Sequence, residues 1–212
     1  MIEAGALLFD MDGLLVDSEP MWFEVERAFA RARGGEWTEE LAHDCVGKGL
    51  ANTLRVMGET FGVAIELERD IAEIVDAFIA RAGELRLKPG GAELVDEAFG
   101  KIPLALASSS HGRLVGAVVD RFGLRPRFGA IVSGDVVAHP KPAPDVFLAA
   151  AKLLDVPPAR CVVLEDSLAG VTAGRAANMR VIAVPEEETP ALAKIADVVV
   201  RDLFEARRHL AF

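Results

Sequence analysis

The stretch Leu7-Leu8-Phe9-Asp10-Met11-Asp12-Gly13 decides the fold of this chain. Its first three residues complete an apolar run, Ala4 to Phe9, that has the length and composition of a buried strand. Side chains two residues apart on an extended backbone face the same side, so Asp10 and Asp12 can point into one site, and Gly13 permits a turn there. Two such carboxylates suit a hard cation such as Mg²⁺ with a nucleophile beside it. The alternative, for this stretch alone, is a strand that runs into an acidic surface turn.

The composition is typical of a globular protein without a polyanionic or membrane partner. The 212 residues are 51% hydrophobic and 26% charged, and 33 acidic against 23 basic residues give a net charge of −10. Nucleic acid would require a basic patch that the sequence lacks. No apolar stretch approaches the ~18 residues of a membrane span, and no basic region precedes the first apolar run, as it would in a secretory signal.

Two cysteines and the helix patterns bear on location and assembly. Cys45 and Cys161 are far apart and neither has a CxxC partner. We therefore expect reduced thiols in a cytoplasmic protein. No exposed apolar helix demands a partner, so we expect a monomer.

The order of predicted elements divides the chain into two parts. Between Pro20 and Leu85 we find helical patterns only, starting near residues 20, 39, 50 and 67. From Lys88 onward, helices alternate with short apolar strands at 102–107, 130–132, 161–164, 181–184 and 198–200. Such alternation predicts an α/β fold with a Rossmann-like parallel sheet and helices on both faces. We expect this core to comprise residues 1–16 and 86–212, with an inserted helical unit of residues 17–85.

Polar side chains follow three of the predicted strands at the point where each strand ends. They are Asp10 and Asp12, Ser108 and Ser109, and Glu165 and Asp166, and Lys141 lies in a proline-bounded loop after a fourth strand. In open α/β sheets, ligands bind at the carboxyl ends of the strands. Three coincidences of this kind argue for one site and against chance acidic turns.

These residue types suit the hydrolysis of a phosphate monoester. The dianion repels nucleophiles, so a metal and a fixed cation have to neutralise its oxygens. Asp10 and Asp166 can hold Mg²⁺, with Glu165 nearby, and Lys141 can contact the phosphoryl oxygens. The Ser108 hydroxyl and the backbone N–H groups after it can bind the phosphate. One carboxylate can attack phosphorus, and another can protonate the leaving oxygen.

Four ordered segments resemble the motifs of the haloacid dehalogenase (HAD) superfamily, across nearly the whole chain. They are Asp10-Met11-Asp12-Gly13, Ser108, 141–145 and 165–170. The resemblance is to the branch of sugar phosphatases, phosphoglycolate phosphatases and β-phosphoglucomutase. It implies a phosphoric monoester hydrolase acting on a small phosphorylated metabolite, with residues 17–85 as a mobile helical cap.

The resemblance also implies a role for each motif residue. Asp10 is the expected nucleophile, Asp12 the general acid/base, and Lys141 the third catalytic residue. Ser108, Ser109 and Lys141 are expected to bind the substrate phosphate. Mg²⁺ is expected on Asp10, the Asp12 backbone carbonyl and the acidic pair Glu165/Asp166.

Two other functions compete with a phosphatase. β-Phosphoglucomutases carry a histidine ten residues after the second aspartate and an arginine in the cap loop, where this chain has Trp22 and Leu50. Residues 17–22 instead resemble hexose-phosphate phosphatases. A phospho-acceptor signalling domain would also combine acidic residues, Ser/Thr and Lys, but such receivers are shorter and lack a helical insert.

Several conspicuous residues also have structural interpretations. We expect Ser110 to cap the following helix and Trp22 to pack inside the helical insert. His111 beside three serines lacks the G-x-S-x-G context of a hydrolase nucleophile, so we assign it no catalytic role. Gly47-Lys48-Gly49 lacks the Walker pattern and is either a cap loop facing the substrate or a plain helix break.

Overall fold

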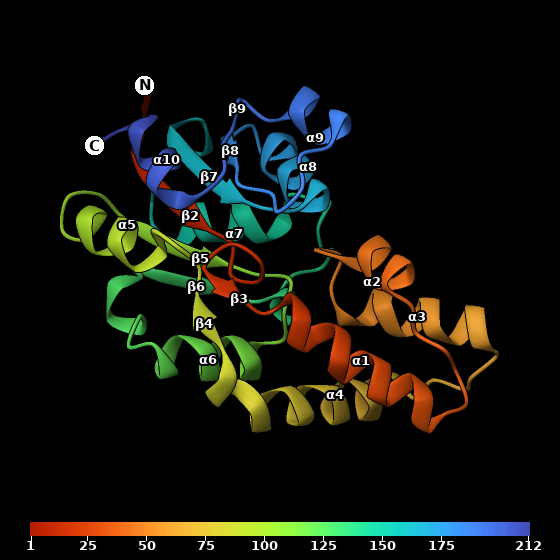
Figure 1. The fold of residues 1–212 in the computed structure, drawn as a ribbon. Coiled ribbons are helices and arrows are strands. Elements are labelled where there is room, and N and C mark those ends of the chain that lie inside the picture. Colours follow the sequence, from red (N-terminus) through yellow and green to blue (C-terminus); the bar gives the residue numbers. More distant parts are fainter.

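A parallel six-stranded sheet forms the centre of the protein in the computed structural model, which describes residues 1–212 (Figure 1). The strand order is β6-β5-β2-β7-β8-β9, so the chain proceeds outward from β2 on one side and returns to β7 on the other. This reversal at β2 is the switch point at which α/β sheets bind ligands. The strands are β2 (Ala6–Phe9), β5 (Leu104–Ala107), β6 (Ala130–Val132), β7 (Cys161–Glu165), β8 (Arg180–Ala183) and β9 (Val198–Val199).

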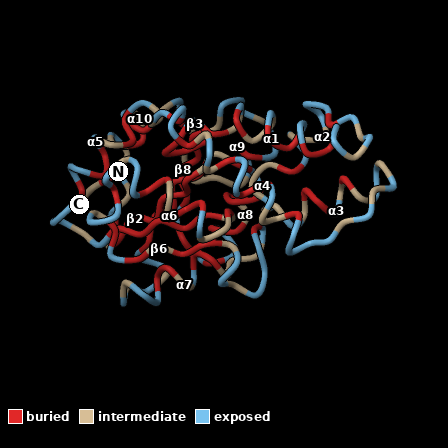
Figure 2. Tube along the Cα trace, turned by 90° about the horizontal axis from the view of Figure 1, so that it is seen from below, coloured by how far each residue is buried: buried red, intermediate tan, exposed pale blue.

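Alternation along β2 divides the core into two layers. Leu7 and Phe9 face a cluster that includes α5, α6 and α10, whereas Ala6 and Leu8 face one that includes α7, α8 and α9. Burying an aliphatic or aromatic side chain contributes roughly 1.5–3 kcal/mol, so a strand buried on both faces is held firmly. Figure 2 shows buried chain running through the sheet. The helices are α5 (Gly91–Ala98), α6 (Gly112–Arg121), α7 (Asp145–Leu153), α8 (Leu168–Ala176), α9 (Pro190–Ile195) and α10 (Leu203–Arg208).

Four helices lie to one side of the sheet, between β3 and β4 (Figure 1). Val25 and Phe29 of α1 and Ile74 and Phe78 of α4 are buried within this part. It is joined to the core through an antiparallel pair in which Asp17 lies opposite Arg86. The elements are β3 (Val16–Asp17), α1 (Glu19–Ala32), α2 (Glu39–Cys45), α3 (Leu50–Phe61), α4 (Leu67–Arg81) and β4 (Arg86–Leu87).

The predicted parallel sheet with helices on both faces is confirmed, with corrections in detail. The helical pattern at 67–85 ends at Arg81, followed by a 3₁₀ turn and β4. Helix α5 was not predicted, because Pro89-Gly90-Gly91 has the composition of a loop. Gly90 starts this helix with φ +84°, and a Cβ there would lie 2.6 Å from the backbone nitrogen of Phe204.

Other short elements complete the fold. Helices α9 and α10 were not predicted either, nor was the pairing of the two ends of the chain through β1 and β10. None of the helices is long and apolar enough to span a bilayer. The remaining elements are β1 (Ile2–Glu3), β10 (Leu210–Ala211) and the 3₁₀ turns η1 (Ala82–Glu84), η2 (Arg125–Arg127), η3 (Gly134–Val136) and η4 (Pro158–Arg160).

Candidate active site

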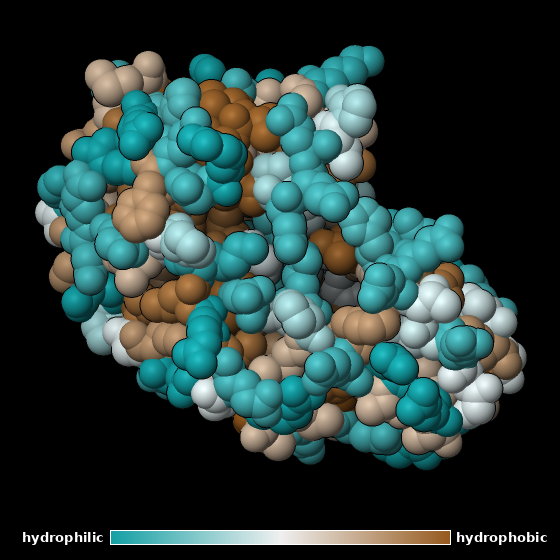
Figure 3. Space-filling model, in the orientation of Figure 1, coloured by the Kyte–Doolittle hydropathy of each residue, from teal (hydrophilic) through white to brown (hydrophobic).

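A cavity of about 250 Å³ lies between the strand ends of the sheet and helices α1–α3. Figure 3 shows the surface hollowed between the two parts of the molecule. The core contributes Asp10, Asp12, Ser108–Ser110, Asp166 and Ser167 to its wall. The helical part contributes Glu19, Trp22, Phe23, Glu26, Glu39, Ala42, His43, Cys45, Val46, Gly47, Gly49, Leu50 and Thr53. Most of the sequence-predicted site residues therefore line one cavity.

Asp10 lies at the centre of the strand-end cluster because of the sheet register. Phe9 pairs with Leu164 of β7, so the next residues, Asp10 and Glu165, end their strands side by side. Lys141 Nζ donates to Asp10 Oδ1 and Glu165 Oε1, at 2.5 Å each, and to the Ala107 carbonyl oxygen at 3.1 Å. All three charged side chains are buried. Lys141 therefore stands behind Asp10 and joins it to Glu165.

With all of its carboxyls ionised, this cluster would carry an excess of negative charge. Burial raises the pKa of Asp10 well above its usual range, and the charges of Glu165 and Asp12 add to this while Lys141 opposes it. Burial likewise raises the pKa of Asp166, with contributions from Glu165 and Asp10. Burial alone would lower the pKa of Lys141, but the adjacent Asp10 and Glu165 carboxylates outweigh it and raise that pKa. Three carboxyls against one ammonium leave an excess that a divalent cation would neutralise.

Carboxyl oxygens of Asp10, Glu165 and Asp166 lie within 4.8 Å of one another, close enough to hold one metal ion. Their other partners differ. Glu165 accepts from Lys141 on Oε1 and from the Ser167 backbone nitrogen (2.9 Å) and hydroxyl (3.0 Å) on Oε2. Asp166 lines the cavity, and its surroundings supply charges but no hydrogen bond. The carboxylate of Asp166 is therefore the freer of the two to bind a metal.

Four donors converge on the Asp12 carboxylate. Oδ1 accepts from the Ser18 hydroxyl (2.8 Å) and Trp22 Nε1 (2.9 Å). Oδ2 accepts from the hydroxyls of Ser110 (2.7 Å) and Ser108 (3.3 Å). Asp12 is thus fixed from both sides of the cavity, by helix α1 and by the loop after β5.

The prediction that Ser110 caps α6 is wrong for this reason. The Ser110 hydroxyl serves Asp12, and the residue that caps α6 is His111, whose Nδ1 accepts from the Arg113 backbone nitrogen at 3.3 Å. Ser18 occupies the N-cap position of α1, but its side chain makes no capping bond. Trp22 packs on Phe78 at 4.3 Å between ring centroids, as expected of an insert residue, yet its indole N–H also holds Asp12.

The loop Gly47-Lys48-Gly49 faces the cavity through its two glycines. The Ser109 hydroxyl donates to the Gly47 carbonyl oxygen at 2.9 Å, so this predicted phosphate-binding residue joins the helical part to the core. Lys48 is exposed, and its ammonium donates to the Asp44 carbonyl oxygen. This loop is therefore more than a plain helix break, because it lines the cavity and contacts the core.

Close approach explains two glycines of the motifs. A Cβ at Gly13, which has φ +77°, would lie 2.0 Å from Asp166 Oδ2. At Gly170 it would lie 1.7 Å from Glu165 Oε1. Any side chain at either position would displace a carboxylate of the acidic cluster.

Sequence reasoning missed three acidic residues of the cavity, Glu19, Glu26 and Glu39. Burial raises the pKa of Glu19, with a contribution from Glu186. Glu26 occurs within the spacing Trp22, Val25, Phe29 that predicts the buried face of α1. An acidic residue on an apolar helix face was the signal that could have identified it.

A parallel sheet with an acidic cluster and one buried lysine at its strand ends places this protein among α/β enzymes. The family model of haloacid dehalogenase-like hydrolases matches residues 4–178. The chain belongs to this family, which confirms the predicted family and the prediction of an enzyme over a signalling domain.

Relatives and solved structures extend the comparison. Hexitol phosphatase B of Escherichia coli (strain K12) is 33% identical over 220 residues, covering 94% of this chain and 93% of that protein. The bifunctional riboflavin kinase/FMN phosphatase of Arabidopsis thaliana is 32% identical, but the 96% of this chain that matches spans only 55% of that protein. CbbY from Rhodobacter sphaeroides has been solved with phosphate and with xylulose-(1,5)bisphosphate. These two structures have TM-scores of 0.85 and 0.82 at 31% and 30% identity, covering 97% of this chain and 96% of theirs.

Proposed function

We propose that this protein is a Mg²⁺-dependent phosphatase that hydrolyses a small phosphorylated metabolite, a sugar or polyol phosphate, through an aspartyl-phosphate intermediate. The observation that carries the proposal is the convergence of Asp10, Asp12, Lys141 and Asp166 at one edge of the sheet, against one cavity. The names of the relatives, a hexitol phosphatase and an enzyme solved with xylulose-(1,5)bisphosphate, support a phosphorylated carbohydrate as the substrate.

The acidic cluster fits a magnesium ion by the chemistry of its donors. Hard carboxylate oxygens are the ligands that Mg²⁺ prefers, and a single buried ammonium does not balance three carboxyls. We assign Asp10, Asp166 and the Asp12 backbone carbonyl as ligands, with Glu165 acting chiefly by holding Lys141 and Ser167. When bound, Mg²⁺ would neutralise phosphoryl charge beside Asp10.

The side chains then divide the reaction. A carboxylate oxygen of Asp10 attacks phosphorus, and Asp12 donates a proton to the ester oxygen as its bond to phosphorus breaks. Asp12 next accepts a proton from a water that attacks the aspartyl phosphate, which releases phosphate and restores Asp10. To reach substrate or water, Asp12 has to exchange one of its four hydrogen-bond donors.

Lys141 and the serine loop would stabilise the transferred group. Lys141 lies within hydrogen-bonding distance of Asp10 and supplies a fixed positive charge beside the reacting phosphorus. The Ser108 hydroxyl and the backbone of Ser109 would bind phosphoryl oxygens. Electrostatic stabilisation of this kind is usually the largest single contribution to phosphoryl transfer.

We assign residues 17–85 as a cap domain that closes on residues 1–16 and 86–212. The proposed boundaries fall in the β3–β4 pair, where only two short strands connect the parts. The Ser109–Gly47 hydrogen bond is a contact that opening would break. Closure would exclude water from the cavity until the alcohol has left.

The test is release of inorganic phosphate from a panel of sugar and polyol phosphates, with and without Mg²⁺. We expect the protein to release phosphate with Mg²⁺ and to stop when the metal is chelated. Asp10→Asn should release no phosphate but keep the helical content of the wild type. Turnover that survives exhaustive chelation would refute the metal assignment. Substantial turnover by Asp10→Asn would refute the covalent mechanism.

A further inference from the structure

Glu26 is a buried carboxyl group in the cavity wall for which the catalytic steps have no use. It projects from α1, the residue is 8% exposed, and it lines the cavity. Trp37 Nε1 donates to Oε2 at 2.9 Å, and no group of the protein donates to Oε1. One carboxylate oxygen is therefore committed to the fold, and the other is available to a ligand.

Support of Trp37 does not by itself account for an acid at this position. Trp37 is 2% exposed, and its indole N–H needs one acceptor. The neutral carbonyl of a glutamine would supply that acceptor without placing an ionisable group in a buried position. Burial raises the pKa of Glu26 to about 7, and the hydrogen bond from Trp37 opposes this only in part. The protein thus has an acid at a position where a neutral residue would cost less folding free energy.

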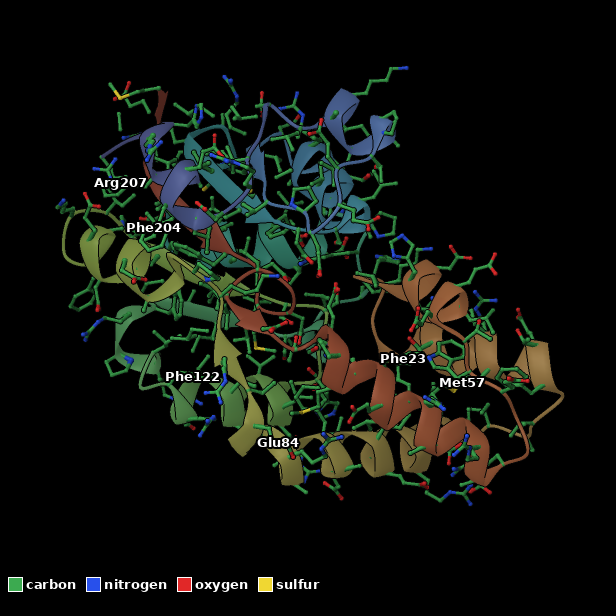
Figure 4. All side chains as sticks on the ribbon, in the orientation of Figure 1. Phe23, Met57, Glu84, Phe122, Phe204 and Arg207 are labelled. Carbon is green, nitrogen blue, oxygen red and sulfur yellow. The ribbon has the colours of Figure 1, made fainter.

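The position of Glu26 suits the alcohol part of a substrate. Trp22 donates to Asp12, and Glu26 lies one helical turn further along α1, about 6 Å by the rise of a helix. Phe23 lies three residues before Glu26 and therefore on the same side of the helix. Figure 4 shows Phe23 and Met57 between α1 and the pair α2–α3. A carbon chain that leads away from the phosphate would meet aromatic surface first and Glu26 beyond it.

The negative charge of the cavity wall restricts which groups the far end of the substrate's carbon chain can carry. Six carboxyls line the cavity: Asp10, Asp12, Glu19, Glu26, Glu39 and Asp166. His43 is the one basic residue in the wall, and no lysine or arginine is part of it. A second phosphate or a carboxylate would find no fixed cation there and would face like charge. A hydroxyl group can donate to a carboxylate without either cost.

We propose that Glu26 recognises a hydroxyl group on the alcohol part of the substrate and that the cavity selects neutral, hydroxyl-bearing monophosphates over bisphosphates and phosphorylated acids. Glu26 Oε1 accepts the hydroxyl hydrogen, while Phe23 and Trp22 contact the carbon chain. The assignment rests on the proposed phosphatase function and specifies its substrate class.

The test compares substrates that differ only at the far end. Sorbitol 6-phosphate and hexyl phosphate share a six-carbon chain with and without hydroxyls, and fructose 6-phosphate and fructose 1,6-bisphosphate differ by one phosphate. Glu26→Met should lower kcat/KM for sorbitol 6-phosphate roughly 10- to 100-fold, because a hydrogen bond to a charged group is lost. For hexyl phosphate it should leave kcat/KM unchanged or higher. Glu26→Gln should raise turnover of the bisphosphate relative to fructose 6-phosphate, since it removes one negative charge.

Trp37→Phe is the matched control, because it removes the same hydrogen bond but leaves the carboxyl. It should keep the sorbitol-to-hexyl ratio of the wild type. If Trp37→Phe shifts that ratio as much as Glu26→Met does, Glu26 is only a support for Trp37. If Glu26→Met keeps the sorbitol-to-hexyl ratio of the wild type, the assignment is also overturned. Should Glu26→Met not fold, the same conclusion follows when Glu26→Gln leaves the ratio of kcat/KM for fructose 1,6-bisphosphate and fructose 6-phosphate unchanged. A wild type that releases phosphate from none of these esters overturns the proposed function itself.

Discussion

Neutralising Glu26 should make the protein more stable at alkaline pH. The folded-state pKa of about 7 compares with an ordinary value of 4.5. Between these values the folded protein retains a proton that the unfolded chain has released, so the free energy of unfolding falls as the pH rises. The loss is absent well below pH 4.5 and complete above pH 7. At 1.36 kcal/mol for each pH unit of difference, it amounts to about 3 kcal/mol.

Urea unfolding of the wild type and Glu26→Gln at several pH values measures this directly. The stability of the variant relative to the wild type should increase by about 2 to 3 kcal/mol between pH 5 and pH 8. Glu24→Gln, on the same helix but exposed, controls for removal of one surface charge. A difference between Glu26→Gln and wild type that stays constant with pH would refute burial as the cause of the raised pKa.

Four further outcomes follow from the site. Asp10→Asn should abolish phosphate release in a steady-state assay while circular dichroism stays that of the wild type. Asp166→Asn should raise the Mg²⁺ concentration for half-maximal activity at least 10-fold, and more than Glu165→Gln does, because Glu165 is already engaged by Lys141 and Ser167. Lys141→Met should lower the free energy of unfolding by about 3 to 5 kcal/mol in urea titrations, since it leaves two buried carboxyls without their ammonium. With glucose 1-phosphate and a bisphosphate primer, the protein should form inorganic phosphate faster than glucose 6-phosphate when both products are measured. Faster formation of glucose 6-phosphate would indicate a mutase.

The parallel sheet and the acidic cluster could be predicted because their signals are local. Asp10 and Glu165 each follow a short apolar strand, and parallel strands bring their carboxyl ends to one edge. Lys141 was conspicuous between two prolines. In each case a few adjacent residues determine both the element and the side chain at its end.

The surroundings of Asp12 could not be predicted, because they depend on tertiary contacts. Ser18 and Trp22 reach Asp12 from α1 and Ser110 reaches it from the loop after β5, whereas local chemistry favours a helix-capping hydrogen bond for both serines. Tertiary hydrogen bonds overrode that preference. Glu26 shows the converse, since its place on an apolar face was visible but its partner Trp37 was not.

The central claim is that Asp10 becomes phosphorylated during turnover. Asp12→Asn with p-nitrophenyl phosphate and Mg²⁺ tests it most directly, because this leaving group needs no protonation and the variant cannot activate water. After rapid quenching in acid and proteolysis, mass spectrometry should find one phosphoryl group on the peptide that contains Asp10, and none when Asp10→Asn is added. If the wild type turns this ester over but Asp12→Asn carries no phosphoryl group on Asp10, or carries it on another residue, the account is contradicted.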